Sequence, residues 1–455
     1  MPVGVGAERG WGMGAATSAR KRASSVRHTR AVQRDRQTQP TLAPSAPPVE
    51  AWLHEVIHPA TLAQVAAYRQ AGLRERLLTL PVMVAFVVSL VWRQLGSVSE
   101  AVRVLRAEGL LWAGPTAVSQ QALSLRLRCL PPALFEGVLT EVLPQAQARW
   151  QARQRPVPPL LQRLRGRFTA VLALDGSTLD AVLHKTGLLR DRPGGVLGGR
   201  IAAVLDVCSM LPRQVWYEAD QHANDLRFWD RAVPQLPAGC LVLFDGGFLN
   251  YAHYDDLGAR GVTFLTRAGA RMAYRATAVL RQTPTLRDRL VAVGSHPQHR
   301  CARPLRLIEV RVGRTWYRYL TNALDPAQLA AEEARAVYAL RWSIERAFLL
   351  AKRLLGLAYL WTGAVNGVLT QVWATWLLYA ALTDLTDAVA DALHLPAERL
   401  SVELTYRALY HFTQAFHRGD ASDVVAYLAA NATTLGLIKR PRRAPSAPLT
   451  PPDDP

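Results

Sequence analysis

YALRWSIERAFLLAK, at residues 338–352, is the stretch that decides how this chain is interpreted. Its polar positions are Tyr338, Arg341, Glu345 and Lys352. At 3.6 residues per turn, a helix brings these four positions within an arc of about 60°. The positions between them are mainly apolar, which predicts a largely buried helix with one polar stripe. A carboxylate buried there needs a partner, and this stripe suits a group that holds a metal ion beside a phosphate. A helix with a partly solvated salt-bridge face is the alternative.

Lysine is rare in this chain. It occurs four times among 54 Lys and Arg residues, at Lys21, Lys185, Lys352 and Lys439. Arginine therefore serves almost wherever a positive charge is needed. A lysine in the stripe indicates a need for a compact point charge, which a planar guanidinium does not supply.

The composition indicates a polyanionic partner. A net charge of +19 and a pI near 10.5 favour nucleic acid, although a base-biased genome that encodes arginine readily explains part of the excess. A chain of 455 residues is long enough for two to four domains.

The expected cellular location is the cytoplasm. The four cysteines have no CxxC spacing and are predicted to be reduced core residues, so neither a zinc site nor a disulfide framework is expected; they are Cys129, Cys208, Cys240 and Cys301. The apolar stretch 78–92 is shorter than the ~20 residues of a membrane span and contains Pro81, so a buried helix is expected. The N-terminal residues include basic side chains without an apolar signal core, so export is not expected.

The N-terminal third divides into two predicted parts. Residues 1–54 are predicted to be a disordered basic arm, and 55–155 a helical DNA-binding domain. Ser97 and Glu100 have capping-box spacing, and a helix is expected over 116–127. These helices resemble a helix-turn-helix, although any small helical bundle has this pattern. The DNA-facing candidates are Ser119, Gln120, Ser124 and Arg128.

From residue 165 onward the pattern is α/β. Strands are expected at 168–174, 200–208, 214–218, 241–244 and 262–266, and helices at 225–233 and 251–260. A mostly β insertion follows over about 270–325, with a hairpin turn at Gly313-Arg314. A long helix is predicted over 328–358, further C-terminal helices over 361–435, and a disordered tail over 436–455.

Two aspartates end the two strongest predicted strands. Asp175 follows the strand at 168–174, and Asp245 follows the strand at 241–244. Carboxylates at the ends of adjacent strands can converge, and Glu345 on a helix across the sheet could supply a third. Hard oxygen ligands of this kind suit Mg²⁺ or Mn²⁺. Two such ions, about 4 Å apart, would serve phosphodiester chemistry. Each aspartate alone is ordinary turn chemistry.

The sequence lacks the motifs of several other enzyme classes. It contains no P-loop and no nucleophile elbow. ATP-driven chemistry and serine hydrolase chemistry are therefore not indicated.

Three blocks carry a family resemblance. LALDGSTLD, VLFDGGFLN and YALRWSIERAFLLAK resemble the signature regions of DDE transposases of the bacterial insertion-sequence "four" family. The third block matches the Tyr-x2-Arg-x3-Glu-x6-Lys pattern at every required position. The resemblance covers roughly residues 60–435. It implies a ribonuclease-H-like catalytic domain over 165–360, with the β insertion between the second Asp and the Glu.

The resemblance also implies roles for particular residues. It makes Asp175, Asp245 and Glu345 the catalytic ligands of two Mg²⁺ or Mn²⁺ ions. Phosphates and the transposon end would be positioned by Tyr338, Arg341 and Lys352. Family members often carry a tryptophan that stacks on a base flipped from the DNA end, a role Trp316 could take, with simple packing as the alternative. Arg267 could contact the DNA backbone or be an ordinary surface residue.

The function implied is that of a DNA transposase, located in the bacterial cytoplasm with the nucleoid. It would bind terminal inverted repeats, cleave DNA at each end and join the freed 3′-hydroxyl to target DNA, as a homodimer assembled on double-stranded DNA and without a membrane. A catalytically silent repressor and a general metal-dependent nuclease are the alternatives. The carboxylate triad argues against the first, and the helical region 55–155 against the second.

Overall fold

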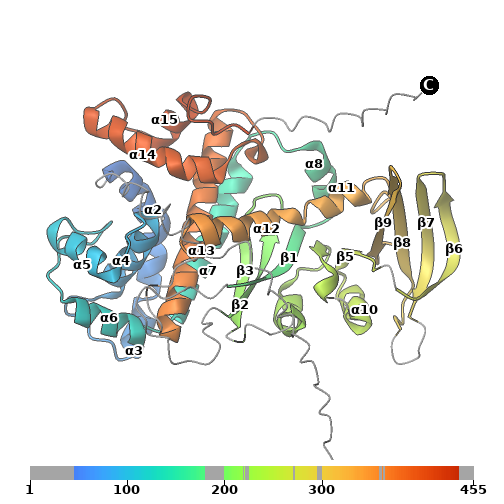
Figure 1. Ribbon diagram of the computed structural model, residues 1–455, viewed down its shortest axis with the longest axis horizontal. Coiled ribbons are helices and arrows are strands. Elements are labelled where there is room, and N and C mark those ends of the chain that lie inside the picture. The colour runs from blue at the N-terminus through green and yellow to red at the C-terminus, as the bar shows by residue number, and fades with distance from the viewer. Residues whose placement is uncertain are drawn as a thin grey trace, which may run out of the picture.

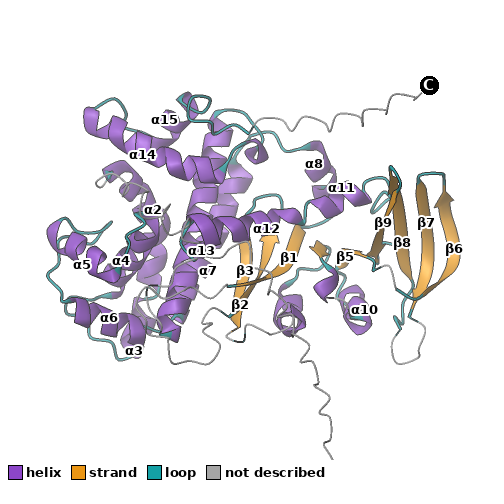
Figure 2. Cartoon of the chain, in the orientation of Figure 1, coloured by secondary structure: helices purple, strands orange, loops and turns teal. Residues whose placement is uncertain are grey.

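The structure is a computed structural model that describes residues 46–179, 199–218, 220, 225–248, 250–269, 272–294, 300–357, 361 and 364–439. Helices gather at one end of the molecule, a mixed sheet lies at the centre, and four antiparallel strands extend the sheet at the other end (Figures 1 and 2). Most of the predicted tail, residues 440–455, and most of the predicted basic arm, residues 1–45, lie outside the described residues. Residues 436–439 of the predicted disordered tail are ordered instead, because Leu437 is buried and Ile438 forms a β-bridge with Leu400.

Within the described residues, seven helices precede the sheet: α2 (Pro47–Ala63), α3 (Val65–Gln70), α4 (Leu80–Trp92), α5 (Val98–Ala107), α6 (Gln120–Cys129), α7 (Ala133–Ala152) and α8 (Pro159–Arg165). The apolar helix α4 begins at the N-cap Thr79 and is almost wholly buried. It packs on the C-terminal helix α13 (Val365–Ala392). A search of the described residues finds no helix with the length and apolar character of a membrane span.

Three predictions for the N-terminal region concern where a helix begins, and the structure tests each of them. Ser97 caps α5 by accepting a hydrogen bond from the Glu100 amide at 3.1 Å, as its spacing predicts. Helix α2 starts at Pro47, inside the predicted arm 1–54, because Val49 and Leu53 are buried apolar positions. Helix α6 starts four residues later than predicted. Its N-cap is Ser119, whose hydroxyl accepts from the Ala122 amide, so this side chain serves the helix.

In the part of the chain that the structure describes, one nine-stranded sheet forms the centre, in the order β3-β2-β1-β4-β5-β9-β8-β7-β6. The strands are β1 (Val171–Thr178), β2 (Arg200–Asp206), β3 (Pro212–Glu218), β4 (Leu241–Phe244), β5 (Thr263–Arg267), β6 (Tyr274–Gln282), β7 (Leu286–Val293), β8 (Leu305–Val312) and β9 (Thr315–Thr321). The neighbours β1, β4 and β5 run parallel, and every other pair is antiparallel. The structure is therefore mixed α/β, as predicted.

The two faces of the sheet carry separate cores. Val171 and Ala173 belong to a core shared with α12 (Trp342–Leu349) and α13. Leu172 and Leu174 belong to a core on the other face, shared with α10 (Tyr251–Ala259) and the short segments η1 (Asp225–Phe228) and α9 (Trp229–Ala232). Because side chains alternate along a strand, Asp175 continues the Val171–Ala173 series and lies on the α12 face.

The first predicted strand is misplaced. We expected it to end at residue 174, but β1 continues to Thr178, so Asp175 lies inside the strand. The reason is long-range pairing: β4 leaves β1 after Ala173, whereas β2 remains paired with β1 up to the Thr178↔Arg200 pair.

The four strands β6 to β9 are joined to the rest of the sheet through the β5–β9 pair. A buried ion pair holds them to the loop before α11 (Ala334–Ala339). Arg306 is fully buried and donates two hydrogen bonds to the Asp288 carboxylate, at 2.8 and 2.7 Å. It also donates to the carbonyls of Ala323 and Leu329.

The helix expected over 328–358 is not continuous. Helix α11 ends at Ala339, and the chain passes into α12 through tighter turns, in which the Arg341 amide donates to the Tyr338 carbonyl at 3.0 Å. Beyond α12 the segment η4 (Leu350–Leu354) is a π-helix. The spacing of 3.6 residues per turn therefore fails on both sides of α12, so the predicted 60° arc is only approximate.

The long helix α13 is tied to the end of α7 through two of its buried aspartates, Asp384 and Asp387. Arg149 contacts Asp384 at 2.8 Å, and Arg153 contacts Asp387 at 2.6 Å. Two further helices, α14 (Val402–Arg418) and α15 (Val424–Ala430), pack on α13. The C-terminal helices thus join the N-terminal helices to the sheet.

The cysteine prediction is partly wrong. All four cysteines are free, and Cys240 and Cys301 are buried as expected. Cys129 is exposed because it is the last residue of α6, where the helix has left its buried side.

The Arg306–Asp288 pair generates a stability prediction. Asp288→Ala should lower the free energy of unfolding by about 3–5 kcal/mol, because it leaves a buried guanidinium without its counter-charge. Urea unfolding measures this. The matched control is Asp256→Ala, which removes an exposed pair with Arg260 and should cost about 1 kcal/mol or less. Equal losses in both variants would contradict the role of burial.

Candidate active site

Asp175 lies on β1. Helix α12 packs on β1 and β2 (Figure 1). Its side chain is 11% exposed. One carboxylate oxygen accepts a hydrogen bond from the Gly176 amide at 2.8 Å, and the other accepts from Arg341 Nη1 at 2.9 Å. The second contact joins the sheet to the segment that enters α12.

Arg341 bridges two of the predicted catalytic carboxylates. Besides contacting Asp175, it donates from Nη2 to Glu345 Oε1 at 2.6 Å, across one helical turn. The Arg341 side chain is 7% exposed, whereas that of Glu345 is 35% exposed. The guanidinium also lies over the rings of Tyr338 and Trp342, with its carbon 5.8 and 5.1 Å from the ring centres.

Asp245 follows β4 and lies beside Asp175 in the sheet. The parallel register pairs Ala173 with Leu243, so both aspartates are two residues beyond the last pair of β1 and β4. Asp245 Oδ1 accepts a hydrogen bond from the Gly247 amide at 2.8 Å, which turns the chain behind it. The two strands thus bring both acids to the same level.

The electrostatics of Asp175 reflect these neighbours. Burial raises the pKa of its carboxyl to about 7, and the negative charges of Asp245 and Glu345 act in the same direction. The Arg341 guanidinium and the Gly176 amide oppose the rise. The carboxyl of Asp175 is therefore buried near two other acids, Asp245 and Glu345, and the Arg341 guanidinium is the cation that contacts it.

Tyr338 and Lys352 lie on either side of this group along the chain. The Tyr338 ring packs against Tyr319 of β9, with centroids 5.3 Å apart, and burial raises the pKa of its hydroxyl. Lys352 lies in the π-helix η4 and is 8% exposed. Its Nζ donates to Ser177 Oγ at 2.7 Å, so its amine reaches the strand that carries Asp175.

The structure places the remaining two candidates, Arg267 and Trp316, on opposite faces of the sheet. Arg267 ends β5 and lies over Tyr317 at 5.7 Å, and it is near enough to Tyr338 to influence the Tyr338 pKa. Trp316 precedes Tyr317 on β9, so strand alternation points it to the opposite face of the sheet. There Arg287 lies over its ring at 4.4 Å. Trp316 is therefore not brought together with the carboxylates.

The donor chemistry fits a divalent cation, but the present arrangement does not form a complete metal cage. Three carboxylates offer the hard oxygen ligands that Mg²⁺ and Mn²⁺ prefer. Among the described residues, no three His, Cys, Asp or Glu side chains are close enough together to hold an ion. The Arg341 guanidinium occupies the position between Asp175 and Glu345, so a cation bound by both acids would require this side chain to move.

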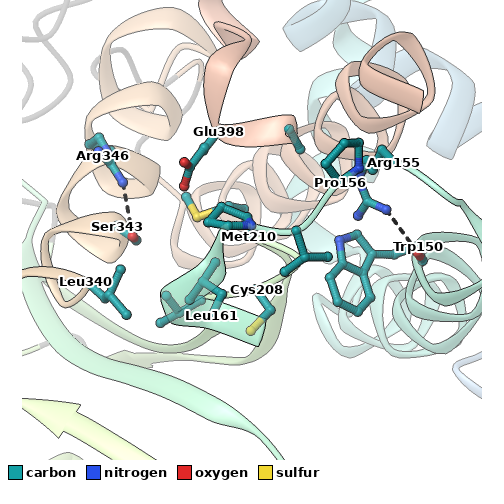
Figure 3. A pocket seen from close by; sticks show the side chains of 14 residues that line it. Trp150, Arg155, Pro156, Leu161, Cys208, Met210, Leu340, Ser343, Arg346 and Glu398 are labelled. Atoms are coloured by element: carbon teal, nitrogen blue, oxygen red, sulfur yellow. Dashed lines mark hydrogen bonds between the residues drawn. The ribbon is translucent and has the colours of Figure 1, made fainter. Parts of the chain in front are cut away.

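A pocket of about 70 Å³ lies on the other side of α12 (Figure 3). Leu340, Ser343 and Arg346 line it from the α12 side, and Trp150 and Arg155 from the end of α7. Arg346 donates to Ser343 Oγ at 3.0 Å, and Arg155 donates to the Trp150 carbonyl. The three candidate carboxylates do not line this pocket, and neither do Tyr338, Arg341, Lys352, Trp316 and Arg267.

Sequence reasoning missed two residues of this site. Ser177 receives Lys352, and strand alternation from Asp175 would have placed it on the same face. Tyr319 packs on Tyr338, but it stands in an ordinary β hairpin and no local signal distinguishes it.

The central region of the chain matches one protein-family model. Residues 166–379 match the family model "Transposase DDE domain". This range includes the three carboxylates and also Tyr338, Arg341, Lys352, Trp316 and Arg267. The match supports a DDE transposase. Comparison with curated proteins found no match.

Among solved structures, the chain is similar to a cryo-EM structure of a piggyBac transposase synaptic complex with hairpin DNA. The identity is 13%, the similarity covers 90% of this chain and 88% of that chain, and the TM-score is 0.38. A similarity this low carries no argument about function.

The arginine bridge generates a prediction for metal binding. In Arg341→Met, Asp175 and Glu345 lose their shared cation, so Mn²⁺ should bind the variant more tightly than the unaltered protein. Ligand binding raises stability through mass action, so 1 mM Mn²⁺ should raise the melting temperature of Arg341→Met more than that of the unaltered protein. Thermal unfolding with and without Mn²⁺ measures the difference. Arg260→Met, which removes an exposed pair, is the control; equal shifts in all three proteins would contradict the prediction.

Proposed function

We propose that this protein is a DNA transposase of the insertion-sequence "four" type, which binds the terminal inverted repeats of its element and catalyses metal-dependent strand cleavage and strand transfer. The observation that carries the proposal is the Arg341 bridge between Asp175 and Glu345, inside the region that matches the transposase DDE domain. A protein of this type would act in the bacterial cytoplasm, at the nucleoid.

The central strands support a ribonuclease-H-like catalytic domain over about 165–360. Strands β3-β2-β1-β4-β5 form a mixed sheet in which β1, β4 and β5 run parallel, with a core on each face. The strands β6 to β9 stand between Asp245 and Glu345 in the sequence and extend this sheet, which suits an insertion of about 270–325. A helical DNA-binding domain over 55–155 and C-terminal helices over 361–435 complete the proposed organisation.

Asp175, Asp245 and Glu345 would hold two Mg²⁺ or Mn²⁺ ions. Such ions activate a water or hydroxyl nucleophile and stabilise the leaving oxygen of a phosphodiester. Arg341, freed from the two acids, would bind a DNA phosphate, because its fork of donors matches phosphate as well as carboxylate.

The other candidates would act on DNA. Lys352 beside Ser177 and Tyr338 beside Arg341 would position the phosphates at the transposon end. Arg267 would contact the backbone nearby. Trp316, on the opposite face of β9, would meet a base only if the DNA end passes around the edge of the extended sheet. The net charge of +19 favours such a partner, and the handling of two ends requires a homodimer on DNA.

Cleavage of a labelled duplex separates the three functions under consideration. The duplex carries the inverted repeat found beside the gene and is incubated with Mg²⁺. A transposase gives 3′-hydroxyl cuts at the repeat boundary, a repressor binds without cutting, and a general nuclease cuts throughout.

Glu345→Gln should abolish cleavage and leave end binding within about threefold, because it removes charge without volume. Glu403→Gln is the matched control, since Glu403 pairs with Arg407 one helical turn away on an exposed face of α14. Gel-based cleavage and binding assays measure both effects. Loss of binding in Glu345→Gln would assign this residue a structural role.

Lys352→Ala should weaken end binding and reduce the slope of log affinity against log salt concentration by about 0.9, the value for one lost phosphate contact. Lys439→Ala is the matched lysine control, because Lys439 donates to the Glu398 carbonyl, in the segment before α14, and not to β1. Binding titrations at several salt concentrations measure the slope. An unchanged slope for Lys352→Ala would remove this lysine from the DNA contact.

A further inference from the structure

The corner between α4 and α5 holds a glutamine in a strained backbone conformation. Gln94 has φ of 51°, in the left-handed region that favours glycine. Among the described residues, three other non-glycine residues share a positive φ: Leu111, Met210 and His394. A glycine would adopt this conformation without strain, so the glutamine side chain is the part of the residue that calls for a role.

That side chain reaches the segment that carries Lys352. The Gln94 side-chain amide donates to the carbonyl of Leu354, which is 260 positions away in the sequence. Leu354 is the last residue of the π-helix η4. The final carbonyls of a helix lack amide partners within it, and Gln94 supplies a donor from a different part of the fold.

The corner itself is firmly held. The Tyr406 hydroxyl of α14 donates to the Trp92 carbonyl at 2.7 Å, and the two rings pack edge to face. Arg93 is buried and pairs with Glu108 at 3.4 Å. Gln94 therefore projects from a fixed support.

The π-helix determines where Lys352 points. Lys352 is the third residue of η4, and its amine donates to Ser177, two residues after Asp175 on the same face of β1. A return of this turn to α-helical spacing would rotate Lys352 about the helix axis. A contact that holds the end of η4 thus also fixes the direction of the lysine.

We propose that Gln94 is a positioning residue: its side-chain amide holds the π-helical turn of η4 and so keeps Lys352 on Ser177, beside Asp175. The N-terminal helices are thereby connected to the candidate active site by one hydrogen bond. The consequence for DNA rests on the proposed function; the positioning of Lys352 does not.

The small number of lysines provides a direct test of the positioning. Protein labelled with ¹⁵N-lysine has four backbone amide signals, and Lys352→Arg identifies the signal of Lys352 by its loss. Gln94→Gly removes the side chain and relieves the strain, and Gln94→Glu keeps the length but loses the donor. Both variants should shift the Lys352 signal and leave that of Lys439 in place.

His394→Gly is the matched control. His394 is exposed and has φ of 52°, so glycine relieves the same strain there without touching η4. The Lys352 signal should remain unchanged in this variant. An unmoved Lys352 signal in both Gln94 variants would overturn the proposal, as would an equal shift in His394→Gly.

End binding tests the consequence for DNA separately. Gln94→Gly should misdirect Lys352 and so lower end affinity by about tenfold, the scale of one hydrogen bond between this charged lysine and a DNA phosphate. In a Lys352→Ala background, Gln94→Gly should cause no further loss of end affinity. A full additional loss in that background would show that Gln94 does not act through Lys352. A shifted Lys352 signal with unchanged binding in Lys352→Ala itself would uphold the positioning and contradict the DNA role proposed for the lysine.

Discussion

The contact on which the candidate site depends is the Arg341 guanidinium held between Asp175 of the sheet and Glu345 of α12. Burying Asp175 is unfavourable without a counter-charge, and Arg341 supplies it. The same contact fixes α12 across β1. Strand alternation and the parallel register of β1 and β4 then bring Asp245 to the same level. The site therefore follows from one ion bridge and from the geometry of two strands.

The sequence predicts the features that depend on neighbouring residues better than those that depend on contacts between distant parts of the chain. Local patterns correctly predict the buried helix α4, the cap at Ser97 and the hairpin of β8 and β9. They misplace the end of β1, because pairing with β2 extends it beyond residue 174. They also miss the π-helix that carries Lys352, since helical spacing there depends on packing and on a contact from Gln94. Which residues belong to the candidate site is thus predictable from the sequence, whereas the directions in which their side chains point are not.

The strands β6 to β9 add a basic and aromatic surface beyond the carboxylates. On one face, Arg287 lies over Trp316, and Arg289 and Arg318 lie over Tyr274. Glu309 pairs with both Arg289 and Arg318, so part of this charge is neutralised within the sheet. Under the proposed function this face would follow a DNA strand by stacking and by contact with phosphates. The carboxylates lie near the other end of the sheet, on the face that α12 covers.

The central claim is that Asp175, Asp245 and Glu345 meet around divalent cations once Arg341 turns to a DNA phosphate. Anomalous diffraction at the manganese edge, from crystals of the protein with a duplex carrying its repeat, tests this most directly. The account predicts manganese peaks within about 2.5 Å of these carboxylates, with Arg341 on the DNA backbone. Manganese bound elsewhere, with Arg341 still bridging Asp175 and Glu345, would contradict it.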